Sequence, residues 1–110
     1  MKLYKIHDHG CDVCKAMSKF DVAVMEGIPE IAFEEISLDQ VTAPHNTDRP
    51  ITMRQLYRCI EEKALNPDYT LDLPVYVCLD KQGAYVNHLQ GAYEVANFRD
   101  GVKSMLVQTD

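Results

Sequence analysis

Two cysteines, Cys11 and Cys14, lie where a predicted strand gives way to a predicted helix, and their spacing constrains the fold most. At a helix start, residues three apart lie one turn from each other, with Cβ atoms about 5–6 Å apart. A disulfide needs Cα atoms about 4.4–6.8 Å apart, so this pair can close without moving the backbone. The first thiol also meets unpaired amides and the positive end of the helix dipole, which favour a thiolate near neutral pH. This arrangement suits dithiol–disulfide exchange.

Length and composition limit the classes of protein that remain. A chain of 110 residues suits one domain spanning residues 1–110, and 46% hydrophobic with 25% charged residues is typical of soluble globular proteins. The net charge of −6 argues against a nucleic-acid partner. The first residues lack the apolar core and cleavage site expected of a signal peptide, and no apolar run approaches 18 residues, so we expect no membrane partner. A cytoplasmic, reducing location is expected, in which a CxxC pair is more often catalytic or metal-binding than structural.

Hydrophobic periodicity predicts alternating strands and helices along the chain. Gly27, Pro29, Pro67 and the residues around them supply the breaks, and Lys81-Gln82-Gly83 fits a hairpin turn. Residues 41–50, with two prolines, are predicted to form a long loop, and Thr52 is the expected cap of the helix that follows. Strands are predicted at residues 2–7, 31–38, 75–79 and 84–89, and helices at residues 11–26, 53–65 and 94–107.

The order βαβαββα predicts an α/β fold with a four-stranded mixed sheet and helices on both faces. The first crossover is expected to be right-handed and to join a parallel pair of strands. The last two strands are expected to form an antiparallel hairpin. Residues 75–79 are apolar at every position, as in a central strand.

This order, with a CxxC pair at the first strand–helix junction and Pro74 opening the third strand, resembles the thioredoxin superfamily in its minimal form. The resemblance covers essentially the whole chain. It implies that Cys11 is the exposed nucleophile and Cys14 the more buried resolving thiol. It also implies that Pro74 is a cis-proline beside the dithiol and that Leu73 offers its backbone to an incoming peptide. Gly91 would be the glycine that follows the last strand and shapes the substrate groove.

The sequence departs from the usual family motifs at several positions. Thioredoxins usually have Trp-Cys-Gly-Pro-Cys, whereas this chain has Gly10-Cys11-Asp12-Val13-Cys14 and no tryptophan. They also carry a buried acid on the first strand, where this sequence has Lys5 or a neighbour. Asp72-Leu73-Pro74 and Gly91-Ala92 replace the Thr-Val-Pro and Gly-Gly of glutaredoxins, which gives poor support for a glutathione site.

Three residues near the cysteines are expected to tune the thiolate. A carboxylate at Asp12, in the first turn of the helix, would repel a thiolate on Cys11 and raise its pKa relative to an uncharged neighbour. A less stabilised thiolate favours a reductant over an oxidant. Lys15 partly offsets this effect, and His9, predicted at the surface of a loop, would help to hold the thiolate when protonated.

A metal-binding interpretation of Cys11 and Cys14 also stays open. Cys11 and Cys14 with His7 or His9 could bind zinc, although zinc needs four ligands and no second cluster supplies the rest. We therefore expect no metal. Cys59 and Cys78 are expected to be inert, buried thiols.

The sequence thus predicts a thiol–disulfide oxidoreductase that reduces protein disulfides through Cys11 and Cys14. Its expected partners are disulfide-containing proteins and an electron donor such as a thioredoxin reductase, and no cofactor of its own is expected. The alternative from another class is a binding, adaptor or redox-sensing module of the same fold without significant turnover.

Overall fold

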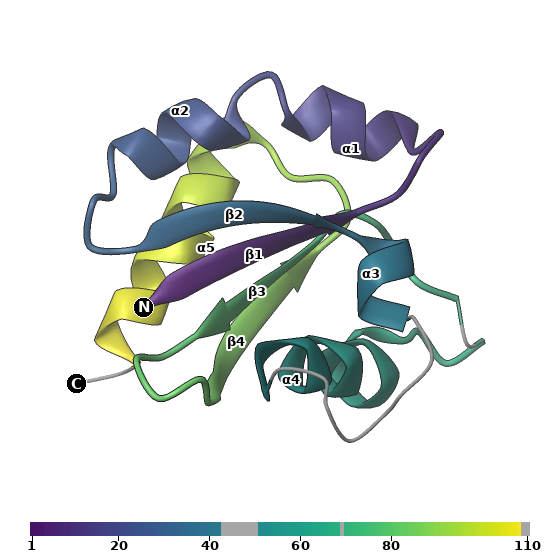
Figure 1. The fold of residues 1–110 in the computed structure, drawn as a ribbon. Helices are drawn as coiled ribbons and strands as arrows, with labels where there is room; N and C mark the ends of the chain where they lie inside the picture. Colours follow the sequence, from purple (N-terminus) through teal and green to yellow (C-terminus); the bar gives the residue numbers. More distant parts are fainter. Residues whose placement is uncertain (43–50, 69, 109–110) are drawn as a thin grey trace.

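The protein contains a four-stranded mixed sheet in the order β2-β1-β3-β4 (Figure 1). The computed structural model describes residues 1–42, 51–68 and 70–108. Strands β1 and β2 are parallel, whereas β3 runs antiparallel to both β1 and β4. The predicted parallel pair, the hairpin and the central place of the third strand are therefore confirmed. The strands are β1 (Lys2–His7), β2 (Ala32–Ser37), β3 (Val75–Leu79) and β4 (Tyr85–Gln90).

Helices cover both faces of the sheet, as the sequence predicts (Figure 1). One face carries α1 (Asp12–Met17), α2 (Asp21–Glu26) and α5 (Val95–Val107). The other carries α3 (Leu38–Thr42), α4 (Ile51–Cys59) and the π-helix η1 (Ile60–Ala64). No helix within the described ranges is long and apolar enough to cross a membrane.

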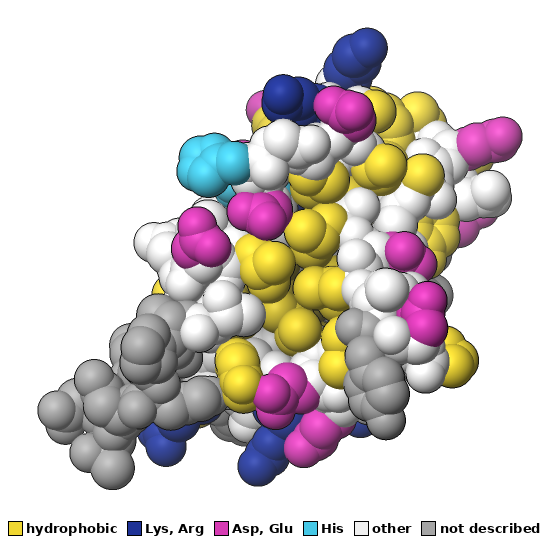
Figure 2. Space-filling view, turned by 90° about the vertical axis from the view of Figure 1, so that its right-hand side faces the viewer, with side chains coloured by type: hydrophobic (Ala, Val, Ile, Leu, Met, Phe, Trp, Pro, Cys, Tyr) yellow, Lys and Arg dark blue, Asp and Glu magenta, His cyan; other side chains and the backbone are white. Residues whose placement is uncertain are grey.

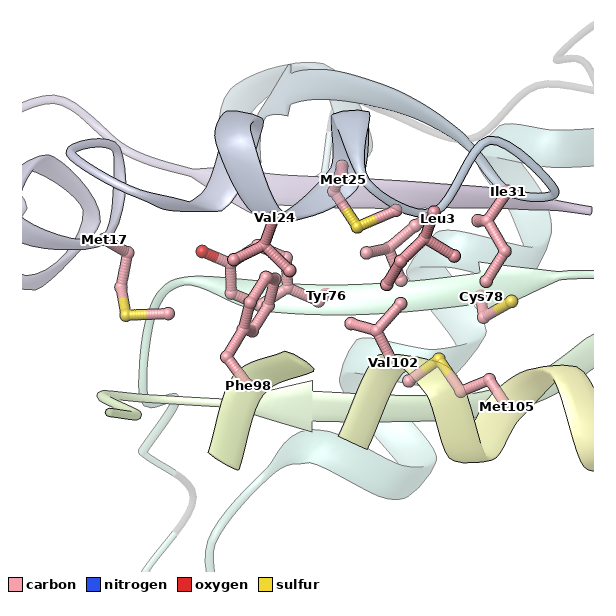
Figure 3. Packing of buried hydrophobic residues seen from close by; sticks show 11 residues of the cluster. Leu3, Met17, Val24, Met25, Ile31, Tyr76, Cys78, Phe98, Val102 and Met105 are labelled. Atoms are coloured by element: carbon pink, nitrogen blue, oxygen red, sulfur yellow. The ribbon is translucent and has the colours of Figure 1, made fainter. Parts of the chain in front are cut away.

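The two faces of β3 belong to two separate cores. Tyr76 and Cys78 pack with the α2 and α5 side chains, whereas Val75, Val77 and Leu79 pack with those of α4 and η1. Successive side chains of a strand point to opposite faces, so every residue of β3 is buried. Figure 3 shows the first core, in which Val24 and Met25 from α2 meet residues of α5 across Tyr76.

The predicted helix over residues 11–26 is wrong in one respect, because the structure divides it into α1 and α2. The Ser18 hydroxyl bonds to the Cys14 carbonyl at 2.9 Å, and the next amides bond back three residues instead of four. Phe20 then leaves the helical region with φ −138°. Periodicity did not reveal the break, because Met17 and Val24 face the same core on either side of it.

The helix predicted over residues 53–65 begins two residues earlier, at Ile51, so Thr52 lies inside α4 and does not cap it. Its last turns widen into η1. The strands predicted at residues 2–7 and 75–79 match the observed ones, and the boundaries of the other two strands and the last helix differ by at most one residue. The predicted loop at 41–50 falls mostly outside the described residues.

The sequence analysis missed α3, which includes the first two residues of that predicted loop. Its signal was present in Ser37 and Gln40. The Gln40 amide donates to the Ser37 hydroxyl at 3.3 Å, and the Ser37 amide donates to the Gln40 side-chain oxygen at 3.1 Å. This reciprocal pair is the capping box that starts a helix.

Candidate active site

The dithiol lies at the end of β1, where the chain turns into α1. Gly10 has φ 76°, a left-handed conformation that glycine adopts readily, and it leads directly into Cys11. Cys11 is the N-cap of α1, and its sulfur accepts the Cys14 amide at 3.1 Å. The two cysteines form a disulfide with Cα atoms 5.3 Å apart, inside the range that a disulfide needs. The local spacing therefore closes the ring as the sequence predicts.

The two sulfurs differ in their access to solvent. Cys11 is half-buried, whereas Cys14 is 5% exposed and faces inward from the first turn of α1. Attack on a substrate needs access, so this difference is consistent with the predicted roles of Cys11 as nucleophile and Cys14 as resolving thiol.

Pro74 and Gly91 lie at the same end of the sheet as the dithiol. Ile6 pairs with Val75, so the end of β1 meets the start of β3. The Leu73–Pro74 peptide is cis, and the Gly91 amide donates to the Pro74 carbonyl at 3.0 Å. Figure 2 looks onto this end of the molecule and shows a band of apolar side chains flanked by acidic and histidine side chains.

A pocket of about 330 Å³ opens beside the disulfide. Cys11, Cys14, His9 and Lys15 all line it, together with the buried Lys5. His9 and Lys15 are exposed, and so is Asp12, which does not line the pocket. The structure thus brings two of the three predicted tuning residues to the pocket and leaves Asp12 beside Cys11 in the first turn of α1.

The position of Asp12 allows its predicted effect to be tested directly. Asp12→Asn removes the negative charge next to Cys11, so it is expected to lower the pKa of Cys11 and make the couple more oxidising. Titration of thiolate absorbance against pH measures the first effect, and equilibration with a glutathione buffer measures the second. Lys19→Gln, an exposed charge change that leaves this turn of α1 intact, serves as the control. An unchanged or higher pKa would mean that solvent screens Asp12 from the sulfur.

Sequence analysis missed a buried ionic cluster behind Cys14. The Lys5 ammonium lies 2.5 Å from Asp21 Oδ2, and the Tyr76 hydroxyl donates to the same oxygen at 2.9 Å. Lys5 is 1% and Asp21 0% exposed. Burial, followed by the Asp21 charge, raises the pKa of Tyr76, which therefore keeps the proton that it donates. Asp21 lies four residues after Met17, which places it on the buried face of the predicted helix. A charged residue at such a position was the sequence signal that could have indicated the buried cluster.

The remaining cysteines lie in the core, as predicted. Cys59 is 1% and Cys78 0% exposed. Desolvation raises the pKa of each thiol to about 11, so both are protonated at neutral pH. Within the described part of the chain, no three His, Cys, Asp or Glu side chains gather as a metal site would require.

Solved structures similar to this chain include thioredoxins, and the chain has the thioredoxin fold. This confirms the predicted fold class. The sequence itself matches no protein-family model and has no significant match among curated proteins.

Three of these similar structures come from different organisms. The periplasmic thioredoxin SoxS of Paracoccus pantotrophus in its reduced form has a TM-score of 0.64 at 10% identity, over 99% of this chain and 98% of that one. The thioredoxin of Fasciola hepatica has a TM-score of 0.58 at 21% identity, over 94% and 79%. Thioredoxin 1 of Thermosipho africanus TCF52B has a TM-score of 0.57 at 15% identity, over 99% and 98%.

Proposed function

We propose that this protein is a thiol–disulfide oxidoreductase that reduces protein disulfides. The observation that carries the proposal is the Cys11–Cys14 disulfide, with one half-buried and one buried sulfur, at the strand end that faces Pro74. The nearby apolar band gives an extended peptide a surface on which to lie (Figure 2).

The reaction follows from the two sulfur environments. The Cys11 thiolate attacks one sulfur of a substrate disulfide, forms a mixed disulfide and releases the other substrate sulfur as a thiolate. Cys14 then attacks Cys11, closes the Cys11–Cys14 disulfide and frees the second substrate thiol. Two electrons pass to the substrate, and the Cys14 proton ends on the departing sulfur. Leu73, Pro74 and Gly91 are proposed to hold the peptide during the exchange.

An external dithiol donor must reduce the protein again, and a flavin-dependent thioredoxin reductase is the proposed donor. We propose that this cycle runs in the cytoplasm, where a reducing environment keeps such a dithiol in its active form.

Reduction of insulin by protein that has been charged with dithiothreitol tests the proposal. The reduced protein is expected to precipitate the insulin B chain well above the rate of dithiothreitol alone. The double variant Cys11→Ser/Cys14→Ser, which keeps the helix start but lacks the dithiol, is expected to show no added rate. If the unmodified protein also stayed at the background rate, the adaptor or sensor interpretation would replace this one.

A further inference from the structure

We infer that the buried Lys5 ammonium is a positioning residue for Cys14, and that it promotes attack by this cysteine on the mixed disulfide. The inference rests on the proposed function and concerns only its second step. Lys5 lies on β1, and its side chain lines the same pocket as Cys11 and Cys14.

Three contacts fix the ammonium beneath Cys14. Lys5 Nζ donates to the Cys14 carbonyl at 3.2 Å and to the Ser18 hydroxyl at 2.8 Å, and it pairs with Asp21. An ammonium has three hydrogens, and these three acceptors match them in number. The cluster therefore needs Lys5 in its protonated form. It ties the backbone of the resolving cysteine to the sheet.

The charges around the cluster show which sign acts on Cys14. The Lys5 ammonium contacts the carbonyl oxygen of Cys14, whereas Asp21 is linked to Cys14 through Lys5. The Glu35 carboxylate lies farther away, 3.8 Å from Lys5 Nζ, and is exposed. In a buried setting the nearer charge has the larger effect, because little water screens it. A positive charge beside Cys14 favours its thiolate, the form that attacks a disulfide.

The step is balanced without a proton transfer from Lys5. Cys14 loses its proton and attacks Cys11 Sγ, the sulfur–sulfur bond to the substrate breaks, and the departing thiolate takes up a proton. Cys11 and Cys14 are oxidised together, and the substrate sulfur is reduced. Lys5 stays protonated throughout and acts through position and charge.

Two neutral pairs test the inference without leaving one buried charge alone. Lys5→Met/Asp21→Asn keeps the side-chain volumes and removes both charges. Lys5→Gln/Asp21→Asn also removes both charges, but it keeps polar groups in the cluster should the first variant fold poorly. Lys2→Met/Glu34→Gln removes an exposed ion pair between β1 and β2, one of whose members lies on the same strand as Lys5, and is the matched control.

The readout separates attack from resolution. Reduced protein is mixed with a symmetrical nitroaryl disulfide, whose thiolate product is coloured. The first equivalent of colour reports attack by Cys11, and the second reports resolution by Cys14. We expect the second phase to slow about tenfold in both neutral pairs, since losing an adjacent cation lowers the thiolate fraction about tenfold for each pKa unit. The first phase is expected to change less than about twofold, and the control to match the unmodified protein in both phases.

The outcomes distinguish the two proposals. A second phase of unchanged rate in folded neutral pairs would overturn the role of Lys5, and so would equal slowing of both phases, which a general loss of structure produces. Failure of the unmodified protein to give the first equivalent would instead count against the proposed function.

Discussion

Replacing Cys14 by Ser is expected to leave the protein joined to its substrates through stable mixed disulfides. Cys11 stays half-buried at the start of α1 and can still attack, but the thiol that would release the substrate is gone. Incubation of the variant with cell extract should give covalent adducts on a non-reducing gel that disappear with dithiothreitol. Cys11→Ser should cause a near-complete loss of adducts, because Cys14 is buried.

Cys59 and Cys78 supply the controls for this experiment. Both thiols are buried, and burial raises the pKa of each to about 11, so they form little thiolate at neutral pH. Changing either to Ala in the Cys14→Ser background should leave the pattern of adducts unchanged. Equal trapping by the two single variants would contradict the assignment of nucleophile and resolving thiol, and trapping that required Cys59 or Cys78 would move the chemistry elsewhere.

Lys5→Met alone is expected to lower the free energy of unfolding by about 3–5 kcal/mol, because it leaves the Asp21 carboxylate buried without its counter-charge. The double variant Lys5→Met/Asp21→Asn should recover most of this loss. Within the described residues, Asp21 Oδ1 has no hydrogen-bond partner, so the ion pair does not fully offset its own desolvation. Urea denaturation of the oxidised proteins, followed by circular dichroism, measures all of these differences.

The exposed pair of Lys2 and Glu34 gives the scale for comparison. Its side chains are 37% and 50% exposed, and Lys2→Met should cost no more than about 1 kcal/mol. If Lys5→Met cost as little as Lys2→Met, the buried cluster would not contribute to the fold as described, and its proposed hold on Cys14 would lose its basis.

Lys5→Met and the neutral pairs together separate the effect of the buried charges on stability from their effect on the reaction. Lys5→Met tests what the buried charges do for folding, and the neutral pairs test what they do for Cys14. A variant that folds normally and still resolves slowly connects the cluster to the reaction. The trapping experiment does not involve Lys5, so it tests the roles of the cysteines independently.

Local sequence determined the elements and the dithiol. Alternation over residues 2–7 and the apolar run over 75–79 reflect side chains that point to opposite faces of a strand, which any strand of this sheet must obey. The Cys11–Cys14 disulfide closes within one turn of chain, so its geometry depends on few other residues. The capping box at Ser37 and Gln40 is equally local, so the start of α3 is also encoded in neighbouring residues.

The tertiary structure alone decided what stands behind Cys14. The sequence pattern places Lys5 on a strand, Asp21 within the helix predicted over residues 11–26 and Tyr76 on another strand, but it does not say that they meet. Tyr76 and Asp21 are separated by 55 positions, and only the packing of α2 against the sheet brings the hydroxyl to the carboxylate. A buried charge is stable only with a partner within contact distance, and local periodicity carries no information about which distant residue supplies it.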